Sequence, residues 1–154
     1  MKTRNSLQPF VIAVFAVTVA VLLASPAKAQ TGFSFFPLSP CRVVDTRDPA
    51  GTNGGPALTT ASRDFQIRGV CGIPMTAKAV AINATVVNAS TNSWLTVWPS
   101  GTAKPFVSTL NYDQNSGAVA NGAIVALSTN TQDLSVANAI GICHVIIDVT
   151  GYYQ

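Results

Sequence analysis

Residues 79–88 read AVAINATVVN, and this run decides the fold class because apolar side chains alternate along it. A period of two puts successive side chains on opposite faces of a β-strand, the pattern of a strand with one face in a core. Further short runs predict strands at residues 42–45, 64–68, 94–98, 106–112, 119–127, 134–137 and 143–149. Loops with strong turn residues, such as NGGP at 53–56, separate them. About eight such strands predict an all-β, antiparallel two-sheet sandwich of the jelly-roll or Greek-key type.

The first 29 residues have the composition of an export signal. Residues 1–4 (MKTR) are basic, residues 10–24 are uncharged and apolar, and Ala27-Lys28-Ala29 is a small-x-small cleavage site before Gln30. A membrane anchor is the alternative, but this apolar run is shorter than the roughly 20 residues that span a bilayer. We therefore expect a signal peptide at 1–29 and a single β-sandwich domain at 30–154. The expected location is secreted or at the cell surface, with the periplasm as an alternative.

Removal of the signal also changes the charge. The formal charge of +3 comes from Lys2, Arg4 and Lys28, because residues 30–154 contain six basic and six aspartate side chains and no glutamate. Nucleic-acid binding and binding to anionic membranes need clustered Lys and Arg. We therefore expect no nucleic-acid partner and, after signal cleavage, no membrane partner.

Three cysteines in an exported chain predict one disulfide and one unpaired thiol. Cys143 shares a strand face with Val145 and Ile147, so we expect it to be a buried hydrophobic residue. Cys41 and Cys71 both border loops, and we expect these two to be bridged. Because a sequence does not fix connectivity, a bridge through Cys143 remains the alternative.

Five motifs follow one another along residues 30–154. They are PLSPCRVVDTR at 37–47, CGIP at 71–74, LTVWPSG at 95–101, STLNY at 108–112 and DVTGYY at 148–153. The chain resembles a family of exported bacterial β-modules that carry these motifs, either alone after a signal peptide or appended to larger extracellular and cell-wall proteins. The resemblance implies an extracellular setting and a mainly β fold, but no particular chemistry. It also implies the pairing of Cys41 with Cys71, whereas Cys143 departs from the family.

Catalytic motifs are largely missing from the sequence. The single histidine, His144, is too few for multi-histidine metal sites, and no nucleophile-elbow or S-x-x-K motif occurs. With no glutamate, a glycosidase would need two aspartates. Strand geometry separates His144 from Asp148 by roughly 13 Å, so we expect His144 to be structural. We expect no catalytic residues, no metal and no cofactor.

The densest polar cluster combines Arg42, Asp45, Arg47 and Asp148. One interpretation is a structural cluster in which Arg42 or Arg47 pairs with Asp148, which lies among apolar strand residues. The other is a Ca²⁺ site with oxygens from Asp45, Asp48 and Asp148. The alternating acidic ligands of an EF-hand are absent, and we favour the structural cluster.

The strand at 94–98 offers the best candidate for ligand binding. Alternation places Trp94, Thr96 and Trp98 on one face, and two exposed indoles about 13 Å apart could stack against sugar rings. The alternative is that the tryptophans belong to the core, because Trp is usually well buried. Other aromatic residues could extend the platform or lie in the core: Phe106, Tyr112 and Tyr152. The candidate ligand-binding residues are Trp94, Thr96, Trp98 and Tyr112.

These observations favour an exported, non-enzymatic surface or cell-wall module that binds polysaccharide. The alternative is a structural surface protein that self-associates through its sheet edges. An aspartate-based extracellular hydrolase is the third and least favoured function.

Overall fold

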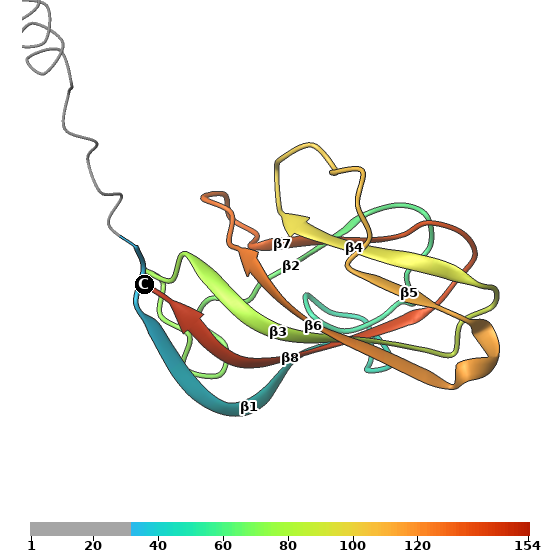
Figure 1. Cartoon of the computed structure of the whole chain (residues 1–154), viewed down its shortest axis with the longest axis horizontal. Coiled ribbons are helices and arrows are strands. Elements are labelled where there is room, and N and C mark those ends of the chain that lie inside the picture. The colour runs from blue at the N-terminus through green and yellow to red at the C-terminus, as the bar shows by residue number, and fades with distance from the viewer. Residues whose placement is uncertain (1–31) are drawn as a thin grey trace, which may run out of the picture. The chain divides into compact units, whose positions relative to one another are not determined.

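The computed structural model describes residues 32–154, which form two antiparallel sheets of four strands each (Figure 1). The first sheet has the order β1-β8-β3-β6 and the second the order β2-β7-β4-β5. The strands are β1 (Phe35–Asp45), β2 (Arg63–Phe65), β3 (Ala79–Val87), β4 (Ser93–Pro99), β5 (Leu110–Tyr112), β6 (Ala118–Ala126), β7 (Leu134–Asn138) and β8 (His144–Tyr153). A 3₁₀ turn, η1 (Gln114–Ser116), joins β5 to β6. The expected signal peptide lies outside the described residues.

The pairing of the strands is nested. β1 pairs with β8, β2 with β7, β3 with β6 and β4 with β5, as in one long hairpin wrapped into two layers. This is the jelly-roll arrangement, so the predicted all-β sandwich is confirmed.

The core lies between the two sheets and is built from alternate residues. On β3, Val80, Ile82, Ala84 and Val86 are buried, and the residues between them are half-buried on the outer face. The second sheet contributes the other half of the core: Phe65, Leu95, Val97, Leu134 and Val136. The period-two pattern of the sequence therefore marks the inner face correctly.

β1 and β5 differ most in length from the strands predicted. β1 begins at Phe35 rather than residue 42, because the chain continues past Pro37 and Pro40 along an edge of the sheet, with register shifts on both sides of Cys41 and Arg42. Edge strands tolerate proline and bulges, which would break a central strand. The strand predicted at 106–112 is reduced to Leu110–Tyr112, and the residues before it form a loop.

Cys41 and Cys71 form the expected disulfide, with their Cα atoms 6.1 Å apart. It ties β1 to the turn after β2. Cys143 is free and buried, as predicted, and burial raises the pKa of its thiol. A disulfide fits an oxidising compartment outside the cytoplasm. Within residues 32–154, none of the helices could cross a membrane.

Candidate functional site

A hollow of about 280 Å³ lies on the outer face of the second sheet, between the start of β4 and the β4–β5 loop. The indole of Trp94 is 39% exposed and forms part of its wall. Asn111 of β5 is the cross-strand partner of Trp94 and is exposed beside it. An aromatic face and an amide therefore stand next to each other on two paired strands, which is a rigid place for a binding site.

The rest of the hollow comes from the loop between β4 and β5, which rises above the sheet in Figure 1. Lys104 and Ser108 supply polar groups, and the exposed ring of Phe106 lies on the same wall as Pro105 and Val107. Lys104 is the single charged residue of the lining. The hollow can thus offer ring stacking, hydrogen bonds and one positive charge, and its volume is close to the lower limit of about 300 Å³ for ligand pockets.

The predicted platform of two indoles is wrong, because Trp98 is only 5% exposed. Trp98 points to the outer face, as the alternation predicts, but the β4–β5 loop folds over it and the Thr102 carbonyl accepts its Nε1–H at 3.2 Å. The same loop buries Thr96, whose hydroxyl donates to the Val107 carbonyl at 2.8 Å. Thr96 still contributes to the lining of the hollow, but only Trp94 offers an exposed indole on this strand.

The prediction that Tyr112 contributes to ligand binding is also wrong. Its side chain lies in the core, where its hydroxyl donates to Asn138 Oδ1, and burial raises its pKa to about 12. Tyr152 is on β8 in the other sheet and stacks on Phe36, so it does not extend the hollow. Of the three aromatic residues considered beside the tryptophans, only Phe106 lines the site.

A second, more open hollow is lined by Asp64, by Ser100 and Gly101, and by residues 129–132. It has no aromatic residue in its lining, and the Gln132 Oε1 atom is buried there without a hydrogen-bond partner. Without a stacking surface, this region is a weaker candidate for sugar binding than the hollow at Trp94.

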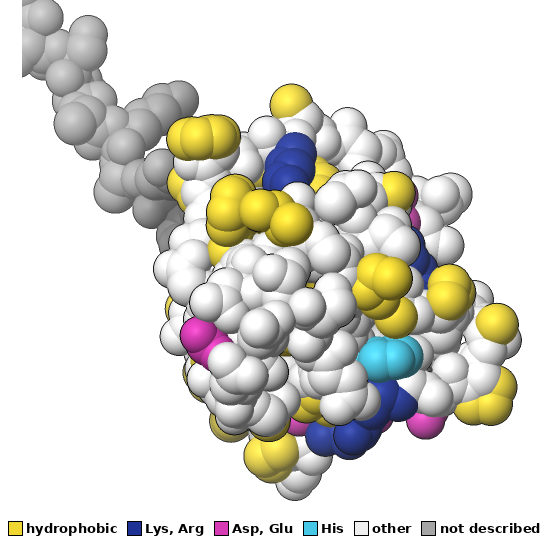
Figure 2. Space-filling model, turned by 90° about the vertical axis from the view of Figure 1, so that its right-hand side faces the viewer, with side chains coloured by type: hydrophobic (Ala, Val, Ile, Leu, Met, Phe, Trp, Pro, Cys, Tyr) yellow, Lys and Arg dark blue, Asp and Glu magenta, His cyan; other side chains and the backbone are white. Residues whose placement is uncertain are grey.

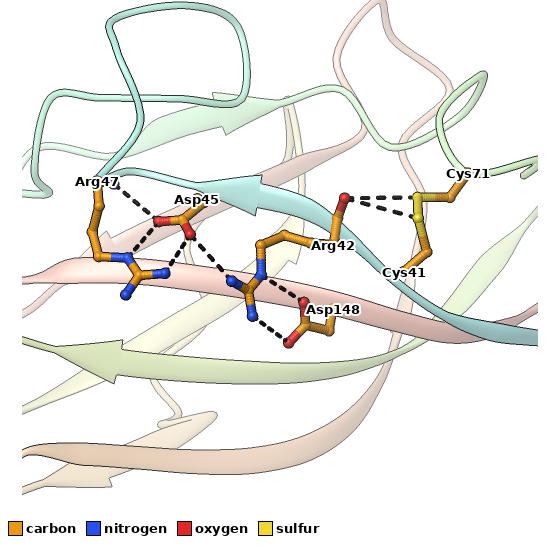
Figure 3. Close-up of polar contacts among 6 residues, drawn as sticks. All are labelled: Cys41, Arg42, Asp45, Arg47, Cys71 and Asp148. Carbon is orange, nitrogen blue, oxygen red and sulfur yellow. Dashed lines mark hydrogen bonds and ion pairs between the residues drawn. A yellow bond between two sulfur atoms is a disulfide. The ribbon is translucent and has the colours of Figure 1, made fainter.

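The predicted polar cluster forms a continuous chain on the outer face of the first sheet (Figure 3). Arg47 Nε donates to Asp45 Oδ1 at 2.8 Å, and Arg42 Nη1 donates to Asp45 Oδ2 at 3.4 Å. Arg42 also binds Asp148 through Nε at 2.9 Å and Nη2 at 3.3 Å. The Arg42 carbonyl oxygen lies beside the disulfide, 3.7 Å from Cys71 Sγ. The cluster therefore joins β1 to β8 at the position where the disulfide holds β1.

These ion pairs argue against acid catalysis by the aspartates and against Ca²⁺ binding by them. Hydrogen bonds from Arg47 lower the pKa of Asp45 to about 2, so this carboxyl is a poor proton donor. The oxygens of Asp45 and Asp148 that would bind Ca²⁺ are already occupied by arginines. Nowhere in residues 32–154 do three or more His, Cys, Asp or Glu side chains form a possible metal site.

Thr46 and His144 fix the end of the strand pair next to Asp45. The Thr46 hydroxyl accepts the Val145 N–H at 2.9 Å, and His144 Nδ1 lies 2.9 Å from the Thr46 carbonyl oxygen. Figure 2 shows the histidine beside Lys and Arg side chains at this end of the domain. The DTR motif at 45–47 thus has a structural explanation, in that it fastens the end of β1 to the start of β8.

Sequence reasoning missed a third structural carboxylate, Asp133. It is fully buried, pairs with Arg68 and accepts the backbone N–H groups of Ile67 and Arg68 at 2.7 Å each. It also missed Lys104 and Asn111 in the hollow. The chain offered one signal for Asn111, which is part of the STLNY motif at 108–112 and directly precedes an aromatic residue.

No protein-family model matches this chain, and no curated protein matches it. The resemblance to exported bacterial β-modules therefore stays a prediction, and the functional argument rests on the geometry of the hollow.

Proposed function

We propose that the domain is an exported, non-enzymatic module that binds polysaccharide in the hollow at Trp94. One observation carries the proposal: an exposed indole stands beside an exposed amide, Asn111, on paired strands, under a loop that adds Phe106 and Lys104. Sugar rings combine an apolar face with hydroxyl groups, so an aromatic face next to a hydrogen-bonding side chain complements them.

The size of the hollow sets the form of the ligand. With one exposed indole instead of two, the site accommodates a single ring or the end of a chain rather than a long stretch of polysaccharide. The lining has a lysine and no carboxylate, which favours neutral or acidic sugars over basic ones. The jelly roll also occurs in lectins, although this is an analogy of fold and not of site.

The experiment is a pull-down of the protein with peptidoglycan, chitin, cellulose and whole bacterial cells, followed by titration of soluble fragments of any glycan that binds. Trp94→Ala and Asn111→Ala are expected to weaken binding at least tenfold, because each removes a contact in the hollow. Phe33→Ala is the matched control, since this ring is also exposed but does not line the hollow.

Tryptophan fluorescence gives a second measurement. Ligand binding is expected to change the emission of Trp94, whereas the buried Trp98 serves as an internal reference. Binding that is unchanged in Trp94→Ala, or lost equally in Phe33→Ala, contradicts the assignment of the site. Failure of every glycan to bind contradicts the proposed function itself.

A further inference from the structure

The two sheets have four edge strands, and three of them are poorly suited to accept another strand. β1 contains Pro37 and Pro40 and two register shifts. β2 and β5 have only three residues each, and β2 carries two charged residues, Arg63 and Asp64. Proline, bulges, charge and shortness are the features by which sheet proteins avoid edge-to-edge pairing.

β6 has none of these features. It has nine residues, AVANGAIVA, and pairs with β3 in one continuous register from Ala118 to Ala126. The sequence has no charged residue between Asp113 and Asp133. On its outer face the Ile124 side chain is 65% exposed, among small side chains. A long, neutral and regular edge strand is a site where another strand can add.

The register shows which backbone groups are free. Leu127 N–H donates to the Lys78 carbonyl, which places odd-numbered residues of β6 in hydrogen-bonded pairs with β3. In an antiparallel pair the alternate residues turn their N–H and C=O groups away. In β6 these alternate residues are Ala118, Ala120, Gly122, Ile124 and Ala126, and their backbone groups point to the open edge because β6 is the last strand of its sheet.

Gly122, at the centre of β6, is not explained by the fold of one chain. Its φ lies outside the left-handed region, no bulge occurs there, and a Cβ would meet only the Ile82 carbonyl oxygen, at 3.9 Å. Glycine inside a strand is less stable than alanine, because its backbone loses more conformational freedom on folding. Such a glycine often marks the close approach of another backbone.

We propose that β6 pairs with β6 of a second copy of this chain, antiparallel about a two-fold axis at Gly122. The axis places Gly122 opposite the Gly122 of the second copy and Ala120 opposite Ile124. Each of these pairs therefore contains at least one small residue, and no like charges face each other. The second copy offers no other long, unobstructed edge, which makes β6 with β6 the available pairing. The first sheets of the two copies, each of four strands, then become one continuous sheet of eight strands. This pairing does not depend on glycan binding.

Sedimentation of protein made from the complete chain tests this interface. The unmodified protein is expected to be a dimer, and Gly122→Lys and Gly122→Glu are each expected to be monomers, because like charges then face each other at the axis. An equimolar mixture of the two variants is expected to form a heterodimer. Thr150→Lys is the control, since it puts a lysine at an exposed position of β8 in the same sheet, and it is expected to remain a dimer.

Cooperative melting of each variant shows that it is folded. If lysine at position 122 prevents folding, the double variant Ala120→Lys with Ile124→Lys provides the same test, because lysines then face each other across the axis at two positions that are already exposed. The proposal is overturned if the unmodified protein is monomeric at all concentrations, or if folded Gly122→Lys remains a dimer. It is also overturned if the charge-swapped mixture does not associate.

Discussion

Asp45 accepts hydrogen bonds from two arginines, although its own side chain is only 5% exposed. Its pKa of about 2 follows mainly from the hydrogen bonds to the Arg47 side chain. Because the native carboxyl binds a proton less tightly than the unfolded one, whose pKa is about 3.8, ionised Asp45 stabilises the fold above about pH 4. The contribution is lost as the pH falls toward 2.

The direction of this pH dependence of stability can be tested with Asp45→Asn. At neutral pH the variant is expected to be less stable, by on the order of 1–2 kcal/mol, since the exposed arginines are partly screened by solvent. The difference is expected to shrink as the pH falls from 4 to 2. Urea unfolding at several pH values measures it, and Asp113→Asn, at an exposed aspartate, is the control. A difference that grows in acid would contradict the assigned direction.

The two tryptophans of β4 are expected to respond differently to truncation. Trp98→Ala removes a buried ring and its hydrogen bond to Thr102, and is expected to lower the free energy of unfolding by about 3–5 kcal/mol. Trp94→Ala, which truncates an exposed ring, is expected to cost less than about 1 kcal/mol. Thermal and denaturant melts of both variants give the comparison, and equal losses would show that Trp94 is part of the core.

Between elements, the disulfide and the arginine–aspartate cluster fix β1, the strand with the most irregular register. The bridge spans 30 residues of sequence and encloses the long β1–β2 loop together with β2. A cross-link of this length stabilises a domain by about 3–4 kcal/mol, chiefly by restricting the unfolded chain.

Cys41→Ala is therefore expected to lower the free energy of unfolding by about 2–5 kcal/mol, and Cys71→Ala by the same amount. Cys143→Ala is the control and is expected to cost less, because it leaves the bridge intact. Denaturant unfolding measures all three. Thiol labelling of the folded parent protein is expected to find no reactive group, since the free thiol is buried; rapid labelling would show that the bridge is not formed.

All eight strands could be predicted in order from the sequence, because apolar and polar side chains alternate wherever one face of a strand packs against the core. It could not predict the burial of Thr96 and Trp98, which depends on how the β4–β5 loop folds back over β4. Period two tells which side of a strand a residue occupies, but it does not tell whether that side is covered. Of the four candidate binding residues, Trp94 and Thr96 line the hollow, whereas Trp98 lies under the loop and Tyr112 lies in the core.

At the scale of the whole molecule, the least predictable contacts are those that join distant segments. Asp133 and Arg68 lie 65 residues apart in sequence, and nothing local indicates that they pair. The jelly-roll pairing is equally non-local, since β1 meets β8 across the entire domain. Composition and periodicity indicate a sandwich, but the identity of each strand's neighbour follows from the packing of the complete core.

The export prediction also concerns the whole molecule. We expect mass spectrometry of the protein recovered from culture fluid or periplasm to show a chain that begins at Gln30, because small residues at 27 and 29 fit the signal peptidase. Substituting Ala29→Arg is expected to block cleavage and to leave the protein associated with membranes. Recovery of exported protein that retains residues 1–29 would contradict the predicted location.

Ser34 and Gln154 exchange two backbone hydrogen bonds, of 2.9 and 3.1 Å, at the end of the β1–β8 pair. A polypeptide that enters the domain at residue 34 therefore leaves it at nearly the same point. Such a domain can be inserted into a surface loop of a host protein, because the two host residues that flank it need to be only a few ångströms apart. The same closeness permits circular permutation: a short linker from 154 to 34, with new ends in the exposed loop at 129–131, keeps every strand pair of the sandwich intact.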